Sequence, residues 1–239
     1  MNMLQIDPKL VYPLGSISLI LAVLPVLILR KDLRKLAIIS LIVFPFEIIS
    51  EFMYFRDYWF PPDITNLNIL GIRVTLGDVL FGIAAPLIMV LMYPFIFNVK
   101  VKLKAICYRS LAKKYFIVMF VITASWIIAT FIFKINSIYT SSIAQLISSF
   151  VIILKRRDLI KVSLISWLLA GLGAFIFYFL FQLIIGTEYI KLVWLLDPAN
   201  HGLYIRNVII PLTEIFFASS MGAFFSIICP FLGKFYYKK

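Results

Sequence analysis

The sequence predicts an all-α, polytopic membrane protein with seven transmembrane helices, built as two parallel three-helix repeats joined by one extra helix. Of its 239 residues, 63% are hydrophobic and only 14% are charged. A soluble domain is roughly 45 to 50% apolar and about 25% charged. The mean hydropathy is +1.03, and the apolar residues are gathered in stretches close to the ~20 residues that one crossing needs. At that length per crossing, the chain leaves no room for a separate soluble catalytic domain.

The expected spans follow one another with short connections. The first starts after Pro8, the second carries Pro45 and two glutamates, and the fourth is the extra helix that keeps the two repeats parallel. A charged or turn-forming stretch separates each span from the next. The spans are Val11 to Leu29, Leu36 to Phe55, Asp78 to Phe97, Tyr115 to Phe133, Ile138 to Leu154, Val162 to Ile185 and Ile209 to Phe231.

The orientation is predicted from the basic residues. Seventeen of the 23 lysines and arginines lie in alternate connections and at the carboxyl end. The positive-inside rule therefore places the amino terminus outside a cell membrane and the carboxyl terminus in the cytoplasm. These residues flank apolar helices with no interleaved aromatic platform, so we expect contact with an anionic inner leaflet and no nucleic-acid partner.

The composition also argues against several chemistries. One histidine, His201, and two distant cysteines, Cys107 and Cys229, are too few for a zinc or iron–sulfur site. The chain has no glycine-rich phosphate loop and no G-x-G-x-x-G fingerprint. We therefore expect no metal and no cofactor.

An internal repeat is indicated by matches at two offsets. Residues 30–35 (RKDLRK) recur at 156–161 (RRDLIK), and residues 75–81 (TLGDVLF) match 211–217 (PLTEIFF). We expect a first repeat over residues 1–98, a basic loop and linking helix over 99–137, and a second repeat over 138–239. Because the fourth span restores the orientation, the repeats are related by an axis along the membrane normal.

Four acidic residues fall within or at the ends of spans, namely Glu47, Glu51, Asp78 and Glu214. A carboxylate at bilayer depth costs at least ~2.5 kcal/mol, so such residues normally face the bundle interior and serve a function. Glu47 and Glu51 are four residues apart on one helix face, where one is expected to be protonated. The alternative readings are helix capping for Asp78 and Glu214 and interhelical hydrogen bonds for Glu47 and Glu51.

Aromatic residues surround these acids in the sequence. We nominate Trp59, Phe81 and Phe217 as ring faces that line a substrate cleft and stabilise a carbocation. The alternative is that most rings face lipid or pack. Residues 58–60 (YWF) and Trp194 read as an interfacial belt.

Two three-helix units, each with an acid at the outer start of its third helix and phenylalanines after it, resemble the carotenoid (lycopene) cyclases of the heterodimeric or fused membrane type. The residues that carry the resemblance lie in 76–81 and 211–217, where only the last acid of the family's Pro-x-Glu-Glu pattern is kept in each copy. The resemblance implies a cofactor-independent isomerase that cyclises the end of a linear carotenoid or polyprenyl chain by acid-initiated carbocation chemistry. It implies Glu214 as the proton donor, kept neutral by burial, and Asp78 as donor, base or cation stabiliser. Glu47 and Glu51 lie outside the family signature and are nominated as replacements for the missing acids.

Other functions stay open. A non-catalytic protein that binds a carotenoid or isoprenoid lipid, or an accessory subunit, fits the reduced acidic motifs. A small proton-coupled transporter fits intramembrane carboxylates in a duplicated bundle. A retinal photoreceptor is disfavoured, because Lys234 lies at the end of the last span rather than in its middle. The expected partner is an apolar isoprenoid or carotenoid substrate, and both homo- and hetero-oligomers are compatible with the sequence.

Overall fold

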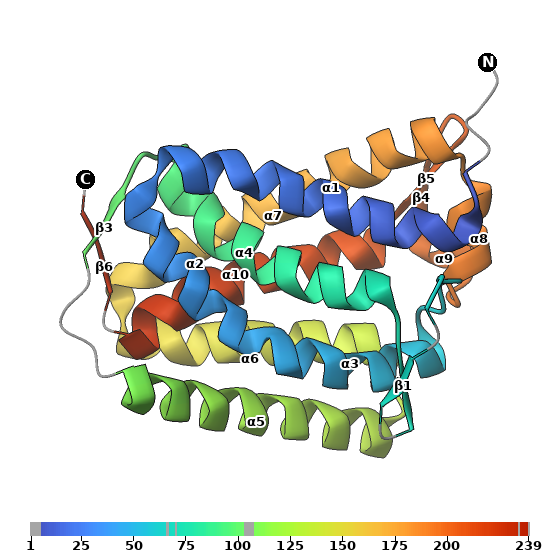
Figure 1. Cartoon of the computed structure of the whole chain (residues 1–239). Coiled ribbons are helices and arrows are strands. Elements are labelled where there is room, and N and C mark those ends of the chain that lie inside the picture. Colours follow the sequence, from blue (N-terminus) through green and yellow to red (C-terminus); the bar gives the residue numbers. More distant parts are fainter. Residues whose placement is uncertain (1–5, 66, 70, 103–107, 234, 239) are drawn as a thin grey trace.

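The computed structural model describes residues 6–65, 67–69, 71–102, 108–233 and 235–238. Most of the chain is helical, and the long helices run side by side from one end of the molecule to the other (Figure 1). The elements are α1 (Pro8–Leu29), η1 (Lys31–Leu33), α2 (Arg34–Ser40), η2 (Leu41–Val43), α3 (Phe44–Asp57), β1 (Leu67–Ile69), β2 (Ile72–Val74), α4 (Leu76–Ile96), β3 (Lys100–Lys102), α5 (Tyr108–Phe133), α6 (Ser137–Lys155), η3 (Arg157–Leu159), α7 (Ile160–Ile185), α8 (Glu188–Val193), α9 (Pro198–His201), β4 (Gly202–Ile205), β5 (Val208–Pro211), α10 (Leu212–Gly233) and β6 (Tyr236–Lys238).

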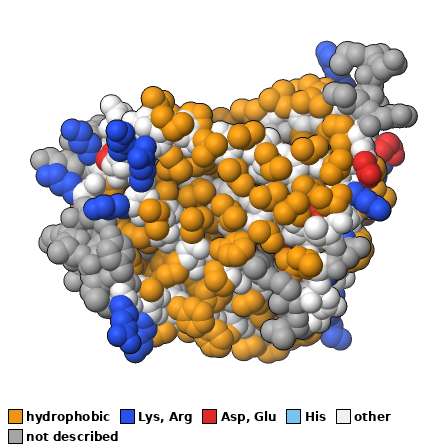
Figure 2. Space-filling model, in the orientation of Figure 1, with side chains coloured by type: hydrophobic (Ala, Val, Ile, Leu, Met, Phe, Trp, Pro, Cys, Tyr) orange, Lys and Arg blue, Asp and Glu red, His pale blue; other side chains and the backbone are white. Residues whose placement is uncertain are grey.

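Within the described residues, six helices are long and apolar enough to cross a membrane: α1, α4, α5, α6, α7 and α10. The predicted membrane class is therefore supported. The space-filling view shows hydrophobic side chains over the middle of the molecule and charged ones towards its two ends (Figure 2). This is the distribution that a bilayer requires of a spanning bundle.

The predicted second span, Leu36 to Phe55, is not one straight helix. The chain there forms α2, the 3-10 turn η2 and α3, and the segments Lys31–Phe46 and Ile49–Asp57 are bent by 55° relative to each other. Pro45 lies at the start of α3. Proline has no backbone N–H and its ring clashes with the preceding turn, so a helix that reaches Pro45 bends or breaks. Counted as one broken crossing, this pair brings the spans to seven.

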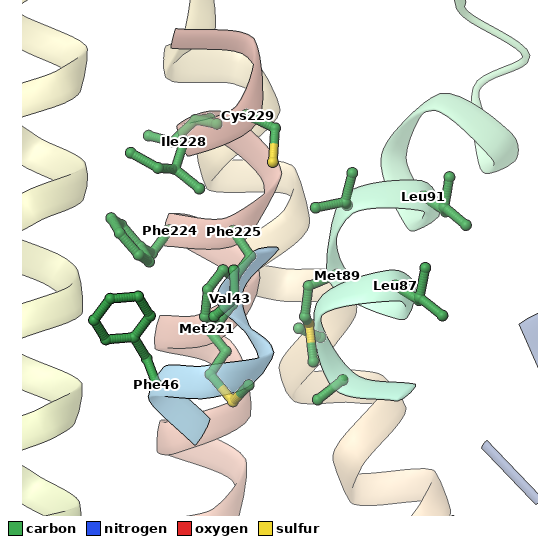
Figure 3. Packing of buried hydrophobic residues seen from close by; sticks show 14 of the residues in the cluster. Val43, Phe46, Leu87, Met89, Leu91, Met221, Phe224, Phe225, Ile228 and Cys229 are labelled. Carbon is green, nitrogen blue, oxygen red and sulfur yellow. The ribbon is translucent and has the colours of Figure 1, made fainter. Parts of the chain in front are cut away.

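Helix α10 is the central element of the bundle. It packs against α7, α6 and α4, and 72% of its apolar span is buried, against 22% for the peripheral α5. Figure 3 shows its side chains beside Val43 and Phe46, with Met89 of α4 turned towards α10. Small residues bring α7 and α10 together, since a Cβ at Gly222 would lie 2.4 Å from the backbone oxygen of Ser166.

The described residues also form three two-stranded antiparallel sheets, which the sequence did not predict. The hairpins β1–β2 and β4–β5 lead directly into α4 and α10 at one end of the molecule, and β3 pairs with β6 at the other (Figure 1). The strands are three or four residues long, too short for their alternation to be distinguished from a loop.

The pairings between the two halves of the chain are reciprocal. In the β3–β6 ladder, Val101 faces Tyr237, and Lys100 and Lys102 face the outer two residues of β6 in antiparallel register. At the opposite end, Trp59 and Trp194 form an antiparallel bridge. There, the amide of Phe60 donates to the carbonyl of Val193 and the amide of Leu195 donates to the carbonyl of Tyr58, both at 2.8 Å.

The two basic turns also have the same geometry. Arg30 donates to both carboxylate oxygens of Asp32, at 2.9 and 2.8 Å, and to the backbone oxygen of Val99. The arginine 126 positions later repeats this arrangement, at 2.7 and 2.6 Å to its own aspartate, and reaches the backbone oxygen just before β6. The matched partners are Arg30 and Arg156, Asp32 and Asp158, and Val99 and Phe235.

Candidate functional site

A cavity of about 80 Å³ lies at the end of the bundle that carries the two hairpins. We call it the acid cavity, because Glu51 and Glu214 both line it. Its wall also contains Trp59, Phe81 and Phe217, so all three aromatic residues nominated from the sequence surround the same space. It is several times larger than the ~10–15 Å³ that one water molecule needs.

Glu214 is the third residue of α10 and is held by tyrosines. The hydroxyl of Tyr58 donates a hydrogen bond to Oε1 of Glu214, and Tyr178 interacts with the same carboxyl. Burial, together with Glu214, raises the pKa of Tyr58 well above its usual range, so the phenol keeps its proton and acts as a donor.

The entry into α10 is fixed by an amide clamp. The Gln182 side chain on α7 accepts a hydrogen bond from the amide of Ile209 at 3.0 Å and donates one to its carbonyl. Ile209 belongs to β5, which runs directly into α10. Because a two-ended clamp holds this strand, the first turn of α10 and its Glu214 have a defined position.

Glu51 reaches the acid cavity from α3. Its side chain is only 7% exposed, in line with the expectation that an acid within a span faces the interior. Tyr12 of α1 lines the same cavity, and its ring packs against Gly77, the residue before Asp78.

Asp78 has a capping function in the structure. Its Oδ2 accepts hydrogen bonds from the amide and hydroxyl of Thr75, at 2.7 and 2.6 Å, and the Thr75 hydroxyl accepts the Asp78 amide at 3.1 Å. This reciprocal pair is a capping box at the start of α4. Asp78 does not line the acid cavity; Tyr12 lies between, packed so closely that a Cβ at Gly77 would be 2.1 Å from its ring.

A second aspartate strengthens the same helix start. Buried Asp63 accepts hydrogen bonds from the amides of Leu76 and Gly77, at 3.3 and 3.1 Å, and from Thr65. Two carboxylates at a helix amino end interact favourably with its dipole. Asp63 lies outside the apolar segments, so the cost of an acid within a span does not single it out.

The nominated rings are close to other aromatic groups of the site. Trp59 lies edge-on to Tyr12, with ring centroids 5.2 Å apart, and Phe81 lies 6.4 Å from the same ring. Phe217 is edge-on to Tyr54 at 5.7 Å. Ring faces of this kind stabilise a nearby cation by about 0.5 to 2 kcal/mol each.

Two expectations about individual residues have different outcomes. The side chain of Glu47 lies outside the described part of the structure. Tyr58 and Trp194, assigned to an interfacial belt, are only 3% and 5% exposed, so both side chains face the interior of the protein. Both are drawn inward by the bridge that joins residues 58–60 to residues 193–195.

Sequence reasoning missed three tyrosines of the site, namely Tyr12, Tyr58 and Tyr178. A tyrosine in a span carries no charge that must be explained, so it gives no signal comparable to that of an acid. Tyr58 and Glu214 are also 156 positions apart, and only the pairing between the two halves brings them together.

A second space, which we call the apolar cavity, has a volume of about 190 Å³. It extends from Glu214 between α4, α7 and α10, with Leu19 of α1 in its wall. Glu214, Tyr178, Phe81 and Phe217 line both cavities, so the two spaces share a wall. Of the residues that line the apolar cavity, only Glu214 and Tyr178 carry polar side chains. The carboxyl group of Glu214 therefore lies at one end of an otherwise largely apolar cavity.

Among the residues that the structure describes, no group of three or more histidine, cysteine, aspartate or glutamate side chains could hold a metal ion.

The comparisons with known proteins agree with the motif resemblance. A family model described as lycopene cyclase matches residues 136–232. The match covers 97 of the 239 residues, so it shows a likeness to that family over the second part of the chain. The matched segment contains Glu214, Tyr178 and Phe217, whereas Glu47, Glu51 and Asp78 precede it. Searches of curated proteins and of solved structures found no match.

Proposed function

We propose that this chain is a lycopene cyclase-like isomerase that closes a ring at one end of a linear carotenoid or polyprenyl chain. The observation that carries the proposal is the position of Glu214. It lies in the segment that matches the family model, it is held by Tyr58, and it lines both a cavity with a second acid and an apolar slot.

The reaction that suits this site is redox-neutral. The neutral carboxyl of Glu214 donates its proton to the terminal double bond of the chain, which leaves a tertiary carbocation. An internal double bond attacks the cation and closes the ring, and loss of a neighbouring proton restores a double bond. The product has the formula of the substrate, so the scheme needs no oxidant, reductant or dissociable cofactor.

The remaining residues are given roles by their positions. We assign Glu51 as the base, since it lines the acid cavity with Glu214. Tyr58 and Tyr178 stabilise the carboxylate that Glu214 becomes, and Trp59, Phe81 and Phe217 stabilise the cation. Asp78 positions α4 through its capping box and acts on the site through Tyr12. Glu47 remains a nominated replacement acid.

The architecture belongs to the same proposal. We infer two parallel three-helix repeats, over residues 1–98 and 138–239, related by a pseudo-two-fold axis along the membrane normal, with seven spans in all. The reciprocal β3–β6 ladder and Trp59–Trp194 bridge support this, because antiparallel pairing of equivalent residues is what a two-fold axis produces. The repeated arginine–aspartate turns support it as well.

We also propose that the protein lies in the cell membrane with its amino terminus outside. Most lysines and arginines then flank the cytoplasmic ends of the helices. The acid cavity, which lies near the amino end of α1, is then in the outer half of the bilayer. The substrate reaches it from the lipid phase.

The test is expression of the chain in cells that accumulate linear carotene, followed by pigment analysis. We expect new cyclic carotenoids with the wild-type chain and none with Glu214→Gln, which keeps the shape but has no acidic proton. Glu188→Gln is the matched control, because Glu188 is an exposed carboxylate on α8, paired with Lys191. Cyclic products that persist in Glu214→Gln would refute the proposed donor.

A second candidate, a non-catalytic binder of linear isoprenoids, is favoured by one observation. The acid of the first repeat, Asp78, is occupied with capping, so the paired acids of the family pattern are not both directed at the cavity. Unchanged linear carotene that co-purifies with the wild-type protein, with no cyclic product, would establish the binder and exclude the cyclase.

A further inference from the structure

The structure contains a third space, of about 40 Å³, between α3, α5, α6 and α10. We call it the covered cavity. Phe217 lines it and the apolar cavity alike, so both spaces adjoin the start of α10. Tyr54 lines both the covered cavity and the acid cavity.

The covered cavity corresponds to the apolar cavity under the proposed repeat. Positions that line the apolar cavity reappear in the covered cavity at the offsets of 126 and 136 that relate the two repeats. The corresponding pairs are Leu19 and Gln145, Phe81 and Phe217, Ile88 and Phe224, and Met89 and Phe225. The bundle therefore has two equivalent clefts, one on each side of its axis.

The two clefts differ in what fills them. In the covered cavity, Phe224 and Phe225 stand at the positions of Ile88 and Met89, and Phe46 adds another ring to the wall. In the apolar cavity, three of the six α7 residues in the wall are small, namely Ala170, Gly173 and Ala174. The bulkier lining agrees with the smaller volume of the covered cavity, about 40 Å³, against about 190 Å³ for the apolar cavity.

The clefts also differ in their access to lipid. Helix α5 lies against the covered cavity and contributes Met119, Thr123 and Trp126 to its wall. The apolar cavity has no such cover on the α7 side, where Gly173 is exposed and a Cβ built on it meets nothing within 4 Å among the described residues. Ile88 of α4, on the same cavity, is only partly buried.

We propose that the apolar cavity is a one-ended binding site for a linear isoprenoid chain. The chain enters from the bilayer between α4 and α7, beside Gly173, and its terminal double bond stops at Glu214. Because α5 and the phenylalanines close the equivalent cleft, one chain end binds at a time. This proposal rests on the proposed function and specifies how its substrate is held.

The dimensions fit the end of a chain rather than a whole molecule. From Phe81 to Met92, α4 lines the slot over about 16 Å at 1.5 Å per residue. The volume is below the ~300 Å³ of pockets that enclose a drug-sized ligand. A long chain therefore leaves most of its length in the lipid, which is as apolar as the cavity.

The test compares two tryptophan substitutions on neighbouring residues of α7. Gly173→Trp places an indole in the opening, whereas Leu172→Trp is the control, because Leu172 is 57% exposed and does not line the cavity. Purified variants are incubated with lycopene as the probe, and the bound pigment is measured by absorbance after removal of free pigment. We expect about one chain per wild-type protein, an unchanged ratio for Leu172→Trp, and at least a tenfold loss of affinity for Gly173→Trp, equivalent to ~1.4 kcal/mol.

A folding check accompanies the comparison. Should Gly173→Trp unfold at a lower temperature than Leu172→Trp, Ala174→Phe replaces it, since Ala174 lines the same opening and is partly buried. Equal binding by the opening variant and the control would overturn the proposed entrance, as would an equal loss in both. Binding of two chains per wild-type protein would overturn the one-ended site.

Binding and cyclisation separate this proposal from the proposed function. Loss of bound lycopene in Gly173→Trp together with absent cyclic product in the wild type leaves the binding site standing and removes the cyclase. Cyclic product that is equally abundant in Gly173→Trp and wild type keeps the cyclase and removes this entrance.

Discussion

Replacing Tyr58 by phenylalanine removes one hydroxyl and leaves the ring in place. That hydroxyl donates to Oε1 of Glu214. In the proposed reaction, Glu214 loses its proton as the carbocation forms, so the Tyr58 hydrogen bond strengthens as negative charge develops on the carboxylate. Tyr58→Phe therefore tests whether this carboxyl group changes its charge during turnover.

The expected loss of rate follows from the strength of one hydrogen bond to a charged group. A hydrogen bond to a charged group contributes about 1.5 to 3 kcal/mol, which corresponds to a rate change of about 10- to 150-fold. Tyr178 also interacts with Glu214 and remains in the variant. We therefore expect a loss near the lower end, about tenfold, in the initial rate of cyclic carotenoid formation by isolated membranes supplied with linear carotene.

Tyr189→Phe is the matched control. Tyr189 lines the same acid cavity, but its hydroxyl oxygen is buried with no hydrogen-bond partner among the described residues. Its removal leaves no group newly unsatisfied, so activity should stay within about twofold and stability should be equal or higher. A rate for Tyr58→Phe equal to that of the wild type would refute the reasoning, and so would equal losses in both variants.

Other predictions concern stability, measured as thermal unfolding in detergent. Gly222→Ala brings a methyl group to 2.4 Å from the backbone oxygen of Ser166 and should lower the free energy of unfolding by about 1 to 3 kcal/mol or more. Gly173→Ala is the control, because its Cβ meets nothing within 4 Å, and it should unfold like the wild type. Equal unfolding temperatures of the two variants would contradict the tight α7–α10 crossing. Asp63→Ala removes the acceptor of two amides at the start of α4 and should cost about 0.5 to 2 kcal/mol. Asp158→Asn, at a pair whose carboxylate is 52% exposed, should cost less than ~1 kcal/mol; a larger loss there than in Asp63→Ala would show that these contacts are ranked wrongly.

The sequence was informative where the bilayer imposes a large free-energy cost. Apolar length predicted the long helices, and the cost of a carboxylate in a span singled out Glu51 and Glu214, which the structure brings to one cavity. The nominated rings Trp59, Phe81 and Phe217 line that cavity as well. Each of these inferences used a property of a single residue or segment, which needs no knowledge of the fold.

Features that depend on pairing between distant segments could not be predicted in this way. The partners of Glu214 are two tyrosines, one from α7 and one from the segment after α3. Tyrosine is not unusual in a membrane protein, so its presence gives no signal. The bend of the second span lies between Phe46 and Ile49, just after Pro45, and an apolar pattern does not give its angle. Asp78 was read both as a site residue and as a cap, and only the position of Thr75 shows its capping contacts.

The β3–β6 ladder and the Trp59–Trp194 bridge fasten the first half of the molecule to the second at opposite ends. Neither junction uses the peptide connection through α5. Two fragments made separately, one ending after β3 and the other beginning at α5, would carry complementary edges and could reassociate within the bilayer.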